Sequence, residues 1–289
     1  MATFIYLHGS FHAAWNWHRL IPLMTQAGHN SIALDLPGHG HSDTPPSGVF
    51  LEACVEQLLA CIDMRSEPVV LVAHSRNGIV ISQAAERRPD RILGLVYLAA
   101  YLVPHGKSMM DYAMTDHASL VVQNVEMALD RRFIPLFMRL FRQRWAQRLC
   151  ALLLPQKFQV HRLAKRVYRE ALYHDCGDDI TELANVLLEA EPNWAGFTPL
   201  QLSAERYGCV RKVYIECLQD RAVTLPLQRR MQAETPCDRV YSLDSGHSPF
   251  FSQPDGLCRT LIDSLQVFAP ARPTPARHPA PTPARRAWA

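Results

Sequence analysis

The feature that most constrains this chain is a short strand, a tight turn and a helix that follow one another in residues 68–83. Four apolar residues in a row, Val69 to Val72, are typical of a strand that is buried on both faces of a parallel sheet. Beyond Gly78 the apolar residues recur with helical spacing. Ser75 lies between the two elements, so it is predicted to project from the turn beside the first N–H groups of the helix.

Buried strands and helices alternate on both sides of this unit. Connections of this kind place helices on both faces of a sheet, so the sequence predicts an α/β fold with a doubly wound, mostly parallel sheet. Helices are predicted over residues 15–26, 50–64 and 254–267, in addition to the one that follows Ser75. The predicted strands cover residues 4–7, 32–34, 69–72, 92–99, 213–217 and 239–243.

The alternation is interrupted between residues 104 and 196, where the apolar spacing is helical and strand character is weak. An insertion at this place lies over the carboxyl edge of the sheet, where such sheets bind ligands, so we expect a helical lid. Residues 1–103 and 197–268 form the two parts of the predicted core. Residues 269–289 contain six prolines, four arginines and no acidic residue, and are predicted to be a disordered Pro/Ala/Arg-rich tail.

Composition argues against several classes of function. The four arginines of the tail exceed the net charge of +3, so the rest of the chain is close to neutral and nucleic-acid binding is not indicated. The eight cysteines form no CxxC pair, and the first residues carry neither a basic region nor a cleavage site, so we expect a cytoplasmic protein with reduced thiols. His8, His12 and His18 lack the spacing of zinc ligands. The glycine-rich residues 35–42 lack the lysine of a phosphate-binding loop, and we therefore expect no metal and no cofactor.

A serine at such a turn needs a base and an acid, because its hydroxyl is a poor nucleophile by itself. Asp220 and His247 each follow one of the last two predicted strands. The carboxyl ends of parallel strands meet at one edge of a sheet, so we expect Ser75, Asp220 and His247 to meet there in the chain order serine, acid, histidine. Asp244 is an alternative acid, although it belongs to the end of its strand.

Two backbone N–H groups that point at the reacting carbonyl would complete such a site as an oxyanion hole. Arg76, directly after the serine, is predicted to supply one, and Ser10, in the loop after the first strand, the other. The turn departs from the motif Gly-x-Ser-x-Gly at both glycines. We expect Asn77, at the second of these positions, to narrow a substrate pocket to which Gly9 and His74 also contribute.

Four segments occur together in a definite order, namely His8–Trp15, Ala73–Gly78, Glu216–Asp220 and Gly246–Pro254. Together they resemble one branch of the α/β-hydrolases, which contains the plant methylesterases (salicylate methylesterase, polyneuridine aldehyde esterase), the plant hydroxynitrile lyases and their bacterial esterase relatives. The similarity covers roughly residues 3–104 and 196–267, and Tyr173–Cys176 at the end of the lid. It implies that the acid is Asp220, which stands at the family's position.

The resemblance and the predicted triad indicate a serine carboxylic ester hydrolase that acts on a small or medium hydrophobic ester through an acyl-enzyme. A hydroxynitrile lyase-like C–C lyase is an alternative, but those relatives carry a lysine after the catalytic histidine, where this chain has Ser248. A second alternative is a non-catalytic ligand-binding or biosynthetic-pathway member of the fold. This alternative stays open because Asn77 departs from the Gly-x-Ser-x-Gly motif. The sequence indicates neither the physiological substrate nor the oligomeric state.

Residues 131–170 are strongly basic, with eleven Lys or Arg and a single acidic residue, Glu170. Apolar residues such as Leu140, Trp145 and Leu149 recur there with helical spacing. We expect a solvated basic face over an apolar underside that packs on the core. Contact with a membrane surface or with a partner protein is the alternative.

Overall fold

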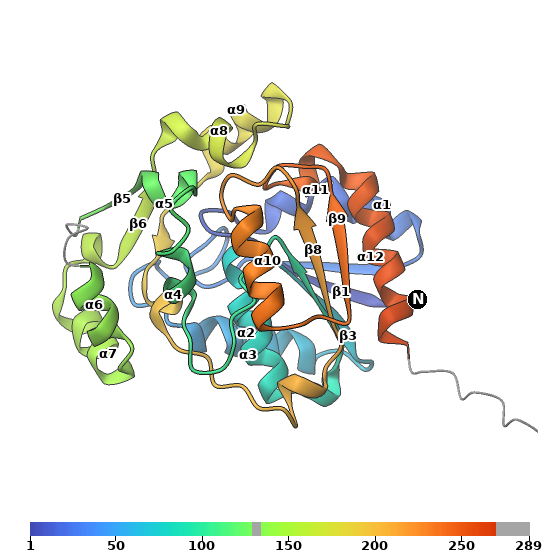
Figure 1. Cartoon of the computed structure of the whole chain (residues 1–289), viewed down its shortest axis with the longest axis horizontal. Coiled ribbons are helices and arrows are strands. Elements are labelled where there is room, and N and C mark those ends of the chain that lie inside the picture. Colours follow the sequence, from blue (N-terminus) through green and yellow to red (C-terminus); the bar gives the residue numbers. More distant parts are fainter. Residues whose placement is uncertain (129–133, 270–289) are drawn as a thin grey trace, which may run out of the picture.

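The computed structural model describes residues 1–128 and 134–269, and Figure 1 shows its course. The predicted α/β fold with a parallel, doubly wound sheet is confirmed. Six strands pair in the order β2-β1-β3-β4-β8-β9, and each neighbouring pair is parallel. The strands are β1 (Thr3–Leu7), β2 (Asn30–Leu34), β3 (Val69–His74), β4 (Ile92–Leu98), β8 (Lys212–Cys217) and β9 (Arg239–Leu243).

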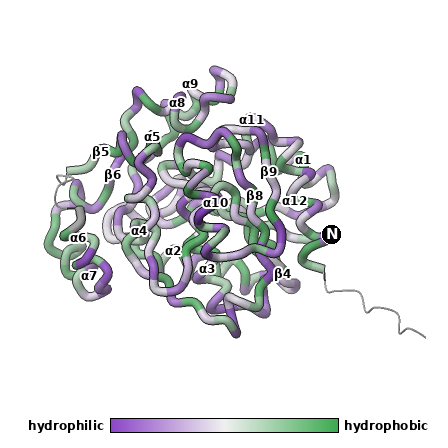
Figure 2. The backbone as a smooth tube through the Cα atoms, in the orientation of Figure 1, coloured by the Kyte–Doolittle hydropathy of each residue, from purple (hydrophilic) through white to green (hydrophobic). Residues whose placement is uncertain are grey.

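The middle of the sheet is buried on both faces, because its strands carry apolar residues at successive positions. In β1, Ile5 and Leu7 belong to one hydrophobic core and Phe4 and Tyr6 to the other. Alternate side chains of a strand point to opposite faces, so one strand serves both cores. Figure 2 shows the hydrophobic stretches that run through the middle of the molecule.

Helices enclose the sheet in two layers (Figure 1). The predicted helix over 15–26 begins later, at Leu20, because residues 14–17 form a separate 3₁₀ turn. One layer consists of α1 (Leu20–Gln26), α11 (Pro249–Ser252) and α12 (Pro254–Phe268), and the other of α2 (Leu51–Asp63), α3 (Gly78–Arg87) and α10 (Leu225–Glu234).

Residues 104–196, which we call the inserted segment, are not purely helical as expected. Short helices alternate with three strands that form a separate antiparallel sheet in the order β5-β6-β7. These strands have two to four residues, too few to show an alternating pattern in the sequence. The elements are α4 (Met109–Ala113), α5 (Leu120–Asn124), β5 (Val125–Met127), α6 (Ile134–Phe141), α7 (Arg144–Leu153), β6 (Val160–Leu163), α8 (Tyr168–Leu172), α9 (Asp178–Leu187) and β7 (Glu191–Pro192).

Within the inserted segment, α6, α7, β5 and β6 lie at the end of the molecule opposite α1 and α12 (Figure 1). We propose residues 104–196 as the extent of this segment, with 1–103 and 197–268 as the two parts of the core. The predicted tail lies outside the described residues from position 270 onward. Among the helices in the described ranges, none is long and apolar enough to cross a membrane.

Candidate active site

Ser75 lies on a strained turn between β3 and α3. Its φ is 55°, in the left-handed region that residues other than glycine rarely adopt. A backbone hydrogen bond stabilises the turn, since the Ser75 carbonyl accepts the N–H of Tyr101 at 2.9 Å. A Cβ on Gly78 would collide with the Tyr101 carbonyl, so glycine is required there and not at the position two after the serine.

His247 and Asp220 form a buried pair in the loops that follow β9 and β8. His247 Nδ1 and Asp220 Oδ2 are 2.7 Å apart, and both side chains are almost inaccessible. Asp220 Oδ1 accepts two further hydrogen bonds, from the N–H groups of Ala222 at 2.7 Å and Val223 at 2.9 Å. Because a carboxylate only accepts, the ring proton of a neutral His247 lies on Nδ1 and leaves the lone pair on Nε2.

Asp244, the alternative acid, lies elsewhere. Its side chain is exposed and accepts a hydrogen bond of 2.7 Å from the Gln219 amide. The structure therefore brings Asp220, and not Asp244, to His247.

Ser10 and Arg76, the residues predicted to supply the oxyanion hole, line the same cavity as Ser75. The Ser10 N–H donates to no other residue of the described ranges. The next N–H along the loop, that of Phe11, donates instead to Glu191 Oε2 at 2.7 Å. Phe11 has a φ of 67°, so this contact from the inserted segment holds the loop in an unusual conformation.

Gly9, His74 and Asn77 do not line the cavity, which corrects the expectation from the sequence. Gly9 lies against the His74 ring, where an added Cβ would be 2.6 Å from Nδ1. His74 Nε2 donates to the carbonyl of His247 at 2.9 Å, so it supports the backbone of the predicted base. Asn77 Nδ2 donates to the carbonyl of His8 at 2.5 Å. With its amide engaged there and a φ of −77°, Asn77 neither narrows the pocket nor strains the turn.

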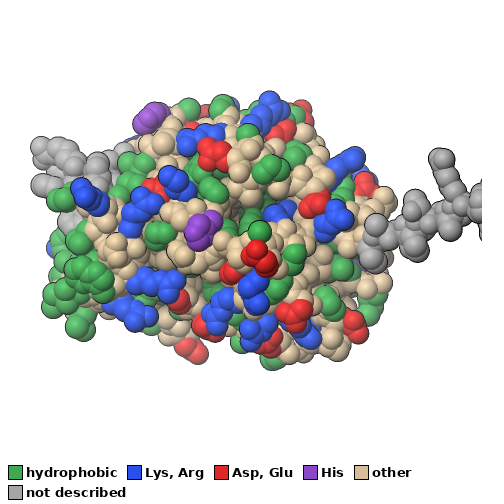
Figure 3. Space-filling view, turned by 60° about the horizontal axis from the view of Figure 1, so that its bottom comes forward, with side chains coloured by type: hydrophobic (Ala, Val, Ile, Leu, Met, Phe, Trp, Pro, Cys, Tyr) green, Lys and Arg blue, Asp and Glu red, His purple; other side chains and the backbone are tan. Residues whose placement is uncertain are grey.

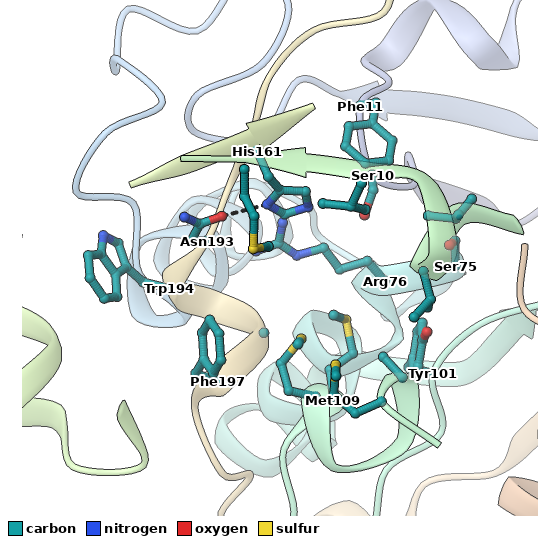
Figure 4. A pocket seen from close by; sticks show the side chains of 18 of the residues that line it. Ser10, Phe11, Ser75, Arg76, Tyr101, Met109, His161, Asn193, Trp194 and Phe197 are labelled. Carbon is teal, nitrogen blue, oxygen red and sulfur yellow. Dashed lines mark hydrogen bonds between the residues drawn. The ribbon is translucent and has the colours of Figure 1, made fainter. Parts of the chain in front are cut away.

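A cavity of about 360 Å³ begins at Ser75 and extends beneath the inserted segment. Figure 4 shows Ser10 and Ser75 on one side of it, with Trp194 and Phe197 on the other. Its wall is mainly apolar and therefore suited to a hydrophobic ligand. Residues of the inserted segment that contribute to the wall include Met109, Met110, Met127, Phe141, Phe158 and Trp194.

The cavity has one polar end, where Arg76 and His161 lie near Asn193 (Figure 4). Asn193 Nδ2 donates to the Phe158 carbonyl at 2.9 Å, and its Oδ1 is 2.5 Å from His161 Nδ1, so this ring nitrogen carries the proton. Burial lowers the pKa of His161 to about 4, which keeps the ring neutral near pH 7. This end of the cavity therefore offers a guanidinium donor and an imidazole acceptor, Nε2.

Glu191, in β7, is a residue of the site that sequence reasoning missed. Its buried carboxylate forms an ion pair with Arg76, accepts the Phe11 N–H and lies 3.3 Å from His39 Nε2. Burial lowers the pKa of Arg76 to about 10 and that of His39 to about 4, so near pH 7 Arg76 is charged and His39 is neutral. Glu191 thus connects the inserted segment to Arg76 and to Phe11, the residue after Ser10. No local pattern marks it, since Phe11 is 180 positions away.

Asp175 makes a second contact that was not predicted. Its Oδ2 accepts the N–H of Gly246 at 2.7 Å, one residue before His247. An added Cβ on Gly246 would be 2.6 Å from Asp175 Oδ1, so glycine permits this approach. The sequence marked Tyr173–Cys176 as part of the family resemblance, but it did not indicate what Asp175 contacts.

The histidines of the first loop are engaged in hydrogen bonds. His8 Nδ1 donates to the Gly9 carbonyl at 2.8 Å, and Nε2 accepts the Leu36 N–H at 3.2 Å. His12 lies between the Ser10 carbonyl and the Tyr173 hydroxyl. Within the described ranges, no group of three or more His, Cys, Asp or Glu side chains could hold a metal ion.

Comparisons with known proteins show which family this chain resembles. The model described as the Alpha/beta hydrolase family matches residues 4–260. Over 281 residues the chain is 29% identical to an Arabidopsis thaliana protein provisionally described as methylesterase 11, chloroplastic; the match covers 91% of this chain and 64% of that longer protein. It is 28% identical to Methylesterase 7 of the same plant, with 92% and 97% covered. The crystal structure of polyneuridine aldehyde esterase, 22% identical, has the same fold, with a TM-score of 0.77 and 91% and 98% covered.

Proposed function

Since this chain belongs to the alpha/beta hydrolase family, we propose that it is a carboxylesterase-type hydrolase with Ser75 as nucleophile. The observation that carries the proposal is the buried 2.7 Å contact between His247 Nδ1 and Asp220 Oδ2, in loops at the carboxyl edge of the sheet, where Ser75 also lies. A base oriented by an acid is what a serine hydroxyl requires. The similarity to plant methylesterases supports ester hydrolysis as the reaction.

In this mechanism His247 Nε2 removes the Ser75 proton while Ser75 Oγ attacks the ester carbonyl. Asp220 holds the ring orientation and stabilises the imidazolium that forms. The N–H groups of Ser10 and Arg76 stabilise the charge on the carbonyl oxygen. His247 then protonates the departing alkoxide, and a water molecule activated in the same way releases the acid from the acyl-enzyme.

The cavity supports a small or medium hydrophobic ester as the substrate. Its volume of about 360 Å³ lies in the range of pockets for small molecules, and apolar side chains form most of its wall. Arg76 and His161 form its polar end, so a substrate with one hydrogen-bonding group remote from the ester fits the cavity better than a plain alkyl ester. We propose a small-molecule ester of this kind.

The C–C lyase alternative has less support in the site. Ser248 follows His247 and is fully buried, and a hydroxyl provides no positive charge for a departing cyanide. The binding-protein alternative depended on Asn77 obstructing the turn, and the hydrogen bond from Asn77 to the His8 carbonyl removes that obstruction.

Turnover of model substrates by purified protein tests the proposal. We expect hydrolysis of p-nitrophenyl acetate and butyrate, a burst of p-nitrophenol that reports the acyl-enzyme, and no release of cyanide from mandelonitrile. Ser75→Ala serves as the control for contaminating esterases. Cyanide release without ester hydrolysis would favour the lyase, and turnover of neither substrate class would contradict both enzyme functions.

A further inference from the structure

The outward sides of α6 and α7 carry exposed apolar side chains. The sequence had led us to expect that these side chains pack on the core. Of the eleven large hydrophobic side chains that are exposed in the described residues, six belong to these two helices, and the other five are scattered. We call the six the outer apolar face. Its members and their exposed fractions are Leu136 (65%), Leu140 (39%), Trp145 (65%), Leu149 (46%), Leu152 (82%) and Leu153 (68%).

The inward sides of the same helices face the active-site cavity. Phe141 and Cys150 line the cavity, and Ala146 and Gln147 are buried. The pair of helices therefore has two apolar faces, whereas a lid exposed only to water needs one. Figure 3 shows hydrophobic side chains gathered at the end of the molecule where α6 and α7 lie. A patch of this kind on a protein surface marks a contact with something apolar.

Positive charge accompanies the outer apolar face. No acidic residue occurs between residues 131 and 169. Arg139 and Arg148 are exposed and form no ion pair with another described residue, whereas Arg142 and Arg144 pair with carboxylates of neighbouring elements. A second copy of the chain on this face would bring like charges together. An anionic bilayer offers the opposite charge and an apolar interior.

We propose that the outer apolar face docks on an anionic lipid surface, with α6 and α7 lying in the plane of the interface. Trp and Leu flanked by arginines are the composition of helices that bind in this way. Phe141 and Cys150 on the inward sides line the cavity, so an ester dissolved in the bilayer would reach Ser75 past the helices that dock. This last step rests on the proposed ester hydrolysis, whereas docking itself does not.

Flotation of the full-length protein with lipid vesicles tests the docking. We expect binding to phosphatidylcholine vesicles that contain phosphatidylglycerol, weakening as salt is raised, and much weaker binding to pure phosphatidylcholine. The double variant Trp145→Ser/Leu149→Ser should lose at least about tenfold in partitioning to the anionic vesicles. Arg139→Gln/Arg148→Gln should lose about tenfold or more on anionic vesicles and little on neutral ones.

Matched controls lie on other elements. Val186→Ser removes an exposed apolar side chain of α9, 80% exposed, and Arg259→Gln removes an exposed arginine of α12. Both should bind vesicles like the wild type, and thermal unfolding should show that all variants fold. The proposal is wrong if the wild type does not float with anionic vesicles, or if the outer-face variants float like the controls. It is also wrong if light scattering shows a dimer that Trp145→Ser/Leu149→Ser dissociates without changing flotation.

An activity measurement separates docking from the proposed chemistry. None of the six residues of the outer apolar face lines the cavity, so the variants should hydrolyse soluble p-nitrophenyl butyrate like the wild type. A long-chain p-nitrophenyl ester carried in anionic vesicles should be hydrolysed several-fold faster by the wild type than by Trp145→Ser/Leu149→Ser. Vesicle binding without any ester turnover would refute the ester hydrolysis alone. Equal rates of both proteins on the vesicle-borne ester would refute access from the bilayer.

Discussion

Two regions surround the same cavity, namely the carboxyl edge of the parallel sheet, which we call the rim, and the inserted segment. Different kinds of interaction hold their residues in place. At the rim, directional hydrogen bonds hold residues such as Asp220, which contacts His247, Ala222 and Val223. The inserted segment contributes mostly apolar side chains to the cavity wall, and it contacts the rim through carboxylates that include those of Glu191 and Asp175. We therefore propose that the rim carries out the chemistry, which depends on geometry, and that the inserted segment selects the ligand.

The largest expected effect is the loss of Ser75, the proposed nucleophile at the rim. Ser75→Ala should lower kcat by on the order of 10⁴-fold or more without lowering the melting temperature, because the three triad residues act as a unit. Ser10→Ala is the matched control, since it keeps the backbone N–H and should stay within a few-fold of the wild type. Steady-state hydrolysis of p-nitrophenyl esters checks both variants. Activity of Ser75→Ala within tenfold of the wild type would exclude Ser75 as nucleophile.

The pairing of acid and base should come next. Asp220→Asn should lower kcat about 10³–10⁴-fold, because an amide can donate to Nδ1 and so favour the wrong tautomer of His247. Asp244→Asn changes an exposed carboxylate on the adjacent loop and should have little effect. Measured kcat values for both variants decide between the two acids. A large loss in Asp244→Asn with a small one in Asp220→Asn would reverse the assignment.

Glu191 tests whether the inserted segment supports the rim. Glu191→Gln leaves the Arg76 guanidinium buried without its carboxylate, and breaking a buried pair costs up to about 3–5 kcal/mol. The Phe11 loop should also shift, so we expect a loss of about 10- to 100-fold in kcat/KM. Glu189→Gln, two residues away, is the control. Denaturant unfolding and kinetics on one ester check the prediction, and an unchanged kcat/KM would show that the rim positions Ser10 without Glu191.

Acidic pH should destabilise the folded protein where the rim and the inserted segment meet, because buried histidines lie there. The pKa values of His39 and His161 are lowered by burial to about 4, so the folded state holds both rings neutral. Their contribution to stability is complete above the unfolded pKa near 6.5 and is lost as the pH falls toward 4, by roughly 3 kcal/mol per ring. The free energy of unfolding should therefore fall from pH 7 to pH 4.5. His39→Gln should flatten this dependence, and an equally steep decline in that variant would contradict the role of His39.

The smallest effect concerns Asn77, which the sequence led us to expect would narrow the substrate pocket, so that its removal would speed hydrolysis. The structure predicts the opposite, because Asn77 donates to the His8 carbonyl and does not line the cavity. Asn77→Gly should lower stability by about 1–2 kcal/mol and raise kcat/KM on no ester. Asn77→Ala removes the amide without adding glycine flexibility and should lose less stability. Measuring kcat/KM for a chain-length series of p-nitrophenyl esters on the three proteins checks this. A tenfold higher kcat/KM in Asn77→Gly would show that Asn77 does narrow the pocket.

The sheet could be predicted from the sequence, and so could the position of Ser75, Asp220 and His247 after three of its strands, because both follow from local patterns. Short apolar runs predict strands, and residues after parallel strands share one edge of the sheet. The order β2-β1-β3-β4-β8-β9 then brings three loops together that lie far apart in the chain. The small sheet β5-β6-β7 escaped prediction because strands of two to four residues carry no periodic signal.

The sequence by itself determined which residues share a face and which follow a strand, since these depend on the period of the backbone alone. Only the tertiary structure decided where such residues point and what they contact. Helical spacing groups Trp145 and Leu149, but their outward direction depends on how α7 packs over the cavity. The pairing of Arg76 with Glu191 and the turn of Asn77 toward His8 join residues that are distant in sequence. No local pattern encodes such contacts, because burial and distance arise only when the whole chain has folded.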